Sequence, residues 1–64
     1  MLKPYTVRIK SDLRPFWHVF DQLESEERAR SHGALALRCG ATAYQIAIQE
    51  GYRGETIIEE KERA

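Results

Sequence analysis

The side chains that could carry acid–base chemistry are few and scattered along the chain. His18, Asp21 and Glu24 lie three residues apart, so a helix through them would place all three on one side. An imidazole and a carboxylate held in this way could exchange protons with a substrate. Catalysis also needs a pocket that excludes water, and a chain of 64 residues rarely encloses one. We therefore interpret the three as the solvent-exposed side of a helix, and the sequence predicts a protein that is not an enzyme.

Metal and cofactor chemistry has no better basis in the sequence. Cys39 is the only cysteine, so no internal disulfide can form, and neither histidine stands at zinc-ligand spacing from it. No glycine-rich phosphate loop follows the one predicted strand. Cys39 has apolar neighbours and is interpreted as a small buried residue, with a reactive thiol as the alternative. We expect no metal, no cofactor and no small-molecule ligand.

The composition indicates a single small cytoplasmic domain. One cysteine and no recognisable export signal are typical of a reducing compartment, and no apolar run is long enough to span a membrane. A chain of this length buries only about 60% of the surface that its unfolded form exposes, so oligomerisation or tight helix packing must add stability. Ten basic and ten acidic residues cancel, which argues against a dedicated nucleic-acid binder. Basic residues gather near the N-terminus and acidic residues near the C-terminus, so the two ends could attract each other within or between chains.

The pattern of apolar residues predicts a mostly α-helical fold with one short N-terminal strand. Residues 5–10 alternate, with Tyr5, Val7 and Ile9 on one face, which is typical of a strand. Residues 12–24 carry aromatic and aliphatic side chains at helical spacing. We expect these apolar side chains to supply most of the core, and they are Leu13, Phe16, Trp17, Val19, Phe20 and Leu23.

Two further helices are predicted over residues 26–39 and 43–50. Ser25 can cap the first of them, and Gly40 can end it. Thr42 opens a capping box for the second helix. This second helix is apolar on nearly all sides, so we expect it to be buried on more than one of them.

The C-terminal segment, residues 56–63, has two interpretations. Its charged run favours a helix, whereas β-branched residues favour a strand from Glu55 to Glu59 that pairs with residues 5–10. In either case the sequence predicts a single compact domain of three or four helices with a helix-turn-helix-like central pair.

The spacing of Ala36, Gly40 and Ile46 resembles that of DNA-binding helix-turn-helix units. A small residue would pack between the helices, the glycine would lie in the turn, and the unit would span residues 32–51. The helix that follows the turn would then enter the major groove. The side chains expected to reach bases or phosphates are Arg38, Thr42, Tyr44, Gln45, Gln49 and Arg53. A pair of helices that only pack against each other would show the same spacing.

Residues 43–54 resemble a short helical motif of bacteriophage tail-fibre proteins. The matching pattern is Ala43-Tyr44-x-Ile46-Ala47-x-x-x-Gly51-Tyr52-x-Gly54. The resemblance implies an apolar helix that ends at Gly51 and a second helix soon after Gly54. It also implies a phage or mobile-element origin and a structural role for these residues.

The sequence predicts a small non-enzymatic regulatory or inhibitory protein that binds an unidentified protein target. We also expect a homodimer in which the helix 43–50 and the strand 5–10 meet their symmetry mates, because so small a core cannot cover both. Trp, Tyr and Arg are the usual anchors of interfaces. The residues predicted to bind the partner are Trp17, Tyr44, Ile48, Tyr52 and Arg53. The alternatives are a dimeric helix-turn-helix regulator of transcription and a structural component of a larger assembly.

Overall fold

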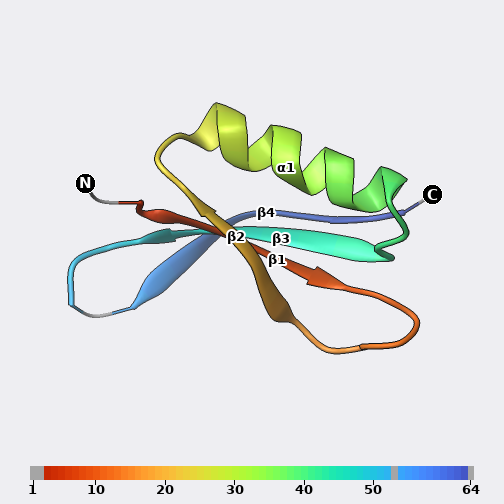
Figure 1. Cartoon of the computed structure of the whole chain (residues 1–64). Coiled ribbons are helices and arrows are strands. Elements are labelled where there is room, and N and C mark those ends of the chain that lie inside the picture. Colours follow the sequence, from red (N-terminus) through yellow and green to blue (C-terminus); the bar gives the residue numbers. More distant parts are fainter. Residues whose placement is uncertain (1–2, 53, 64) are drawn as a thin grey trace.

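The computed structural model describes residues 3–52 and 54–63, which form two β-hairpins separated by one helix (Figure 1). The elements are β1 Tyr5–Lys10, β2 His18–Leu23, α1 Glu26–Arg38, β3 Ala43–Gln49 and β4 Glu55–Glu62. The predicted mostly α-helical fold of three or four helices is therefore wrong, since the described residues form four strands and a single helix.

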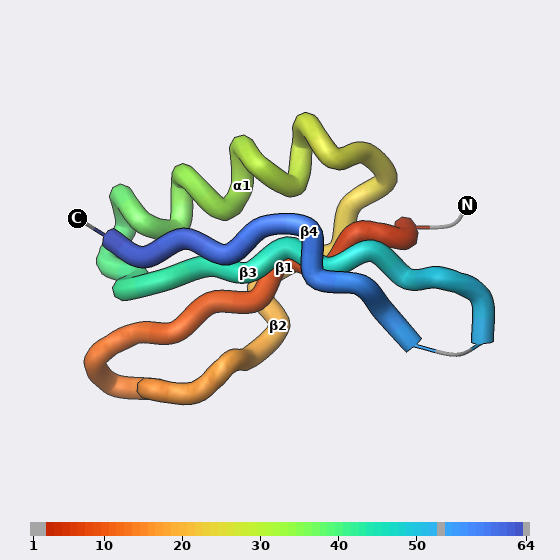
Figure 2. Tube along the Cα trace, turned by 180° about the vertical axis from the view of Figure 1, so that it is seen from behind, coloured from red at the N-terminus to blue at the C-terminus, as the bar shows by residue number. Residues whose placement is uncertain are grey.

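The four strands form one antiparallel sheet in the spatial order β2-β1-β3-β4. α1 lies over one face of this sheet, as the two opposite views in Figures 1 and 2 show. β1 occupies the six residues whose alternation predicts a strand, and it pairs with β2 on one side and with β3 on the other. Both central strands thus have their backbone groups paired within the chain, and neither needs a strand from a second copy.

Residues 12–24 do not form the predicted helix. Ser11 and Arg14 close a turn through two backbone hydrogen bonds of 2.9 and 3.2 Å, and β2 follows from His18. Val19 pairs with Arg8 and Asp21 pairs with Val7, so Phe20 is an extra residue at a β-bulge. This extra residue interrupts the alternation of apolar side chains in β2, and the interrupted pattern imitates the spacing of a helix.

The predicted helix over residues 43–50 is also wrong, because this segment forms β3. Its large apolar side chains alternate, and Tyr44 and Ile46 are buried on the face that α1 covers. Ala43 and Ala47 lie on the opposite face, and because they are small and apolar the segment reads as apolar all round. Since a strand stands where the second helix was expected, the predicted helix-turn-helix unit over residues 32–51 does not form.

The C-terminal segment is a strand, and its neighbour differs from the one that the sequence suggests. β4 pairs with β3 and not with residues 5–10. Ile46 pairs with Glu59 and Ala47 pairs with Ile57, so Ile58 is the extra residue of a second β-bulge. Ile58 packs against the core, whereas Ile57 is exposed.

The helix begins and ends through the local signals that the sequence carries. The Ser25 hydroxyl accepts a hydrogen bond from the Arg28 backbone N–H at 3.3 Å, and α1 starts directly after this cap. At the other end, the Cys39 N–H is bonded to the last turn, and Gly40 adopts a φ of 111° that favours glycine. Cys39 itself is exposed, so the predicted burial of this residue is wrong.

The core between helix and sheet is small and depends on one close approach. Its buried members are Val7, Leu23, Ala29, Tyr44 and Ile46. The Tyr44 ring lies directly against Gly33 of α1, because a Cβ atom at Gly33 would come within 2.7 Å of the ring. The Tyr44 hydroxyl donates a hydrogen bond to Glu59 at 2.8 Å, which joins the core to β4. Burial and this hydrogen bond raise the pKa of Tyr44 above its usual value.

Candidate interaction surface

The β1–β2 hairpin exposes large apolar side chains whose spacing predicts a place in the core. The exposed fractions are 95% for Leu13, 56% for Phe16, 57% for Val19 and 43% for Phe20. We call these four residues the hairpin patch. Single exposed apolar residues are ordinary on protein surfaces, whereas several grouped on one element mark a binding surface. The prediction that these four residues form the core is therefore wrong.

The hairpin patch lies away from α1, and a contact between β2 and α1 fixes the position of the hairpin. The ribbon in Figure 1 and the tube in Figure 2 both place the loop between β1 and β2 away from α1. Ser11 and Arg14 fix the turn next to Leu13 through their backbone hydrogen bonds. Asp21 of β2 contacts His32 of α1 at 2.8 Å, which anchors the second strand of the hairpin to the helix. The patch thus stands on an ordered element, which lowers the entropy cost of binding.

Cationic side chains border the aromatic residues of the hairpin. The Lys10 ammonium lies 4.4 Å from the centre of the Trp17 ring, and the Arg14 guanidinium lies 5.4 Å from that of Phe16. Asp12 is the one acidic residue of the loop between β1 and β2. The border of the hairpin patch is therefore net positive.

The predicted partner-binding residues are spread over the molecule. Trp17 is half-buried beside the hairpin patch, and Tyr52 is fully exposed at the opposite hairpin turn. Tyr44 is buried in the core, and Ile48 is half-buried on the face toward α1. Arg53 lies outside the described residues. Of the four that the structure describes, only Trp17 thus lies beside the apolar surface that the fold exposes.

The residues predicted to contact DNA share no recognition helix. Arg38 ends α1, and Thr42 precedes β3. Gln45 and Gln49 alternate along β3 on the face that α1 leaves uncovered. Gln45 is held by Arg8 and Glu60, since it accepts a hydrogen bond from the first at 3.2 Å and donates one to the second at 3.3 Å. The geometry on which DNA recognition depended is therefore absent from the residues that the structure describes.

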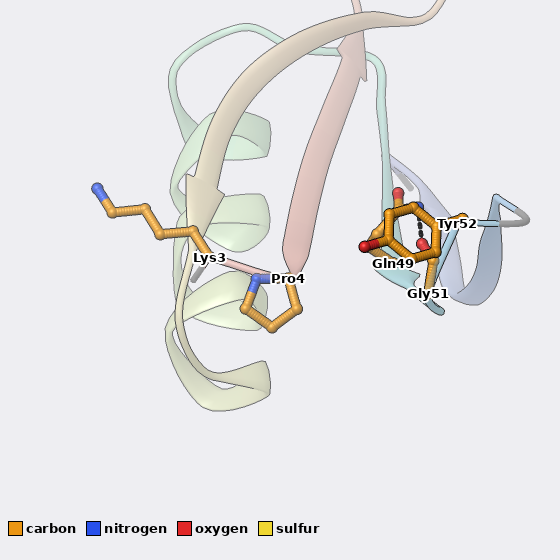
Figure 3. Close-up of a pocket in the computed structure, with 5 residues that line it drawn as sticks. All are labelled: Lys3, Pro4, Gln49, Gly51 and Tyr52. Atoms are coloured by element: carbon orange, nitrogen blue, oxygen red, sulfur yellow. Dashed lines mark hydrogen bonds between the residues drawn. The ribbon is translucent and has the colours of Figure 1, made fainter. Parts of the chain in front are cut away.

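A hollow of about 420 Å³ lies beside the β3–β4 turn (Figure 3). Its lining residues are Lys3, Pro4, Gln49, Gly51 and Tyr52. The Gln49 side chain donates a hydrogen bond to the Gly51 carbonyl at 2.9 Å, and the Lys3 side chain extends away from Tyr52 in the close-up. Among the described residues that line the hollow, the titratable side chains are Lys3 and Tyr52, and they do not lie together.

The three residues with the spacing for acid–base chemistry serve other contacts. Asp21 is bound to His32, and the His18 ring nitrogen Nδ1 lies 3.1 Å from the Phe16 carbonyl. Glu24 lies beside Arg28 on the surface at 3.8 Å. Within residues 3–52 and 54–63, no three His, Cys, Asp or Glu side chains gather closely enough to hold a metal ion. No helix in these ranges is long and apolar enough to cross a membrane.

Arg8 and Glu55 form an ion pair on the face of the sheet that α1 leaves uncovered. The Arg8 guanidinium donates to the Glu55 carboxylate across β3, and both side chains are about three-quarters buried, with 24% and 28% exposed. The hydrogen bond from Arg8, together with its charge, holds the pKa of Glu55 below its usual range against the opposing effect of burial. The same contact raises the pKa of Arg8. The basic N-terminal strand and the acidic C-terminal strand therefore attract each other within one chain.

Glu55→Gln is expected to reduce the acid sensitivity of the protein. Because the folded pKa of Glu55 lies below the unfolded value of about 4.3, the ion pair stabilises the fold above that pH. This contribution, at most about 1 kcal/mol for a partly exposed pair, is lost as the pH falls through the folded pKa. Melting temperatures measured from neutral pH to acid should fall less steeply for Glu55→Gln than for the unmodified protein. Glu27→Gln, which removes an exposed carboxylate of α1, is the control, and an equal change in both variants would contradict the assignment.

The sequence alone could have indicated that the apolar residues of the hairpin are exposed, if residues 12–17 had been interpreted as a loop and not as a helix. Leu13, Phe16, Val19 and Phe20 belong to the strongest apolar group in the chain, and helical spacing alone assigns them to the core. Pro15 lies among them, and a loop accommodates proline without the loss of a backbone hydrogen bond. With the proline interpreted as part of a loop, Leu13 and Phe16 have no helix to bury them, and the same sequence indicates their exposure.

Comparisons with known proteins supply no relative for this chain. It matches no protein-family model, no curated protein and no solved structure. The resemblance of residues 43–54 to tail-fibre proteins stays a prediction, although the described part of this segment forms β3 and a turn where that resemblance implied a helix.

Proposed function

We propose that this protein is a small non-enzymatic regulatory protein that binds a partner protein through the hairpin patch. The observation that carries the proposal is the exposure of Leu13, Phe16, Val19 and Phe20 on a single hairpin. A fold with so small a core would gain stability by burying these side chains. Their exposure in the isolated chain is accounted for when a partner covers them.

The border of the patch indicates the chemistry of the partner. Lys10 and Arg14 lie against aromatic rings, where they keep a positive charge close to the apolar side chains. A complementary surface would have an apolar recess for Leu13 and Phe16 and acidic side chains around it. We therefore infer a partner protein with an acidic-rimmed apolar groove.

Capture from an extract of the cells that encode the protein tests this function. The full chain is immobilised, and bound proteins are identified by mass spectrometry with nuclease present. We expect a discrete protein that Leu13→Ser combined with Phe16→Ser loses, since removing interface anchors costs about 1–2 kcal/mol each, or tenfold or more in affinity.

Leu35→Ser is the matched control because Leu35 is a half-exposed leucine on α1, away from the hairpin. Melting temperatures of both variants establish that each is folded. The proposal fails if no discrete protein is captured, if the hairpin variant captures it as well as the unmodified chain, or if Leu35→Ser abolishes capture.

A further inference from the structure

The face of the sheet that α1 leaves uncovered, which we call the open face, changes sign from one side to the other. The pairing register places Arg8 and Lys10 of β1 on this face, opposite the side of Val7. The same register places Glu60 and Glu62 of β4 on it, because they pair with Gln45 and Ala43. The face is thus basic along β1, where Arg8 is paired with Glu55 and Lys10 is not, and acidic along β4.

Lys10 and Glu62, which lie at the end of the face near Ser11, form no ion pair within the described residues. Lys10 and Glu62 flank Ala43 on its two neighbouring strands, and no ion pair in residues 3–52 and 54–63 uses either of them. A hollow of about 310 Å³ lies over Ala43, and its walls are Lys10, Thr42, Glu62 and Arg63. A long side chain from a second molecule can enter this hollow.

The centre of the open face carries small side chains beside the ion pair of Arg8 and Glu55, which crosses β3. Thr6, Ala43 and Ala47 occupy central positions and carry small side chains. Val19 and Ile57 stand on either side of them with 57% and 44% of their surface exposed. A second sheet stacked about 10 Å away, as in a sandwich, would bury Val19 and Ile57.

We propose that the open face binds a second copy of this chain, and that the two-fold axis runs along the strands. Rotation about this axis places the basic side of one copy over the acidic side of the other, so that Lys10 faces Glu62 of the partner subunit. An axis across the strands would instead place the basic side over itself. The sign change across the face thus selects one of the two arrangements.

Two properties of the whole chain support a second copy as the occupant. The chain carries ten basic and ten acidic residues, so two copies do not repel each other through net charge. Its core is small, and burial of the open face adds to the apolar area removed from water. A polyanion such as a nucleic acid fits less well, because Glu60 and Glu62 line one side of the face.

Charge reversal tests the proposed interface in the full chain. Light scattering over the micromolar range is expected to give a dimer mass that shifts to monomer in Lys10→Glu and in Glu62→Lys, with dimer affinity lowered about tenfold by each. The double variant, Lys10→Glu with Glu62→Lys, should recover the dimer. Dimerisation of the unmodified chain should also weaken from about 0.01 M to about 1 M salt, as the Debye length falls from about 30 to about 3 Å.

Lys61→Glu is the matched control, because Lys61 lies on the same strand but on the opposite face from Glu62. Melting temperatures show whether Lys10→Glu, which also removes the contact with Trp17, remains folded. A monomer at all concentrations, a dimer unaffected by Glu62→Lys, or a double variant that stays monomeric would overturn the proposal. Because Lys10 borders the hairpin patch and Val19 belongs to it, capture of the partner protein is measured in Glu62→Lys, which alters no residue of that patch. Capture that persists when the dimer is lost distinguishes the two proposals.

Discussion

Replacing Gly33 with alanine is expected to lower the free energy of unfolding by about 1–3 kcal/mol. The added Cβ atom would lie 2.7, 2.8 and 2.9 Å from three atoms of the Tyr44 ring, closer than carbon atoms can approach without a shift of the structure. The ring cannot move freely, because it is buried and its hydroxyl is bonded to Glu59. Helix propensity alone predicts the opposite sign, since alanine stabilises a helix interior by about 1 kcal/mol relative to glycine.

Ser31→Ala separates the two effects, because Ser31 is an exposed residue of the same helix. Urea denaturation of both variants should show a loss of stability for Gly33→Ala and a small gain for Ser31→Ala. A gain for both would mean that the contact between Gly33 and Tyr44 is looser than the structure shows.

Ile46→Ala is expected to cost about 2–5 kcal/mol of stability, more than truncation of any other aliphatic side chain in the core. Ile46 is completely buried at the centre of the sheet, between β1 and β4 and beneath α1. A chain of this length has roughly 3–10 kcal/mol of stability in total, so the variant should be partly or wholly unfolded. Circular dichroism on heating measures the loss directly.

Two control variants test whether the loss of stability in Ile46→Ala comes from the burial of this side chain. Ile46→Val removes one methylene and should cost about 0.5–1.5 kcal/mol. Leu13→Ala removes more apolar surface but at a side chain that is 95% exposed, so its melting temperature should stay close to that of the unmodified protein. If Leu13→Ala were as damaging as Ile46→Ala, Leu13 would belong to the core and the hairpin patch would not exist.

Local sequence patterns are sufficient to predict two of the five elements, β1 and α1. The alternation of Tyr5, Val7 and Ile9 coincides with β1, because that strand has no bulge over these residues. Ser25 caps α1 where the sequence predicts a cap, and glycine follows its end. In both elements the local preference and the tertiary contacts favour the same conformation.

The sequence predicts helices where β2 and β3 form and leaves β4 open between helix and strand, for physical reasons that spacing does not show. Bulges at Phe20 and Ile58 shift the alternation in β2 and β4, so neither strand has an uninterrupted period of two. A half-buried strand usually alternates apolar and polar residues, but β3 has alanine at two positions of the open face, so this alternation is lost. The tertiary pairing of these segments overrides their local preference, and it cannot be read from spacing alone.

The incorrect helix over residues 12–24 also explains why the predicted binding residues miss the hairpin patch. Such a helix would bury Phe16 and Phe20, which excludes them as contacts. The preference of interfaces for Trp, Tyr and Arg then favours Tyr44, which the structure places in the core. Residue type therefore suggests anchors, but the fold decides which of them a partner can reach.

The ladder between β1 and β3 also sets the order in which the chain can close its contacts. Its partners, such as Lys10 and Ala43, are more than thirty residues apart, whereas each hairpin and the helix form between near neighbours in the sequence. Local units can therefore appear early, but the loop-closure entropy of this ladder must be overcome before Val7 and Ile46 are covered. The meeting of β1 and β3 is thus the step that turns two hairpins and a helix into one cooperative folding unit.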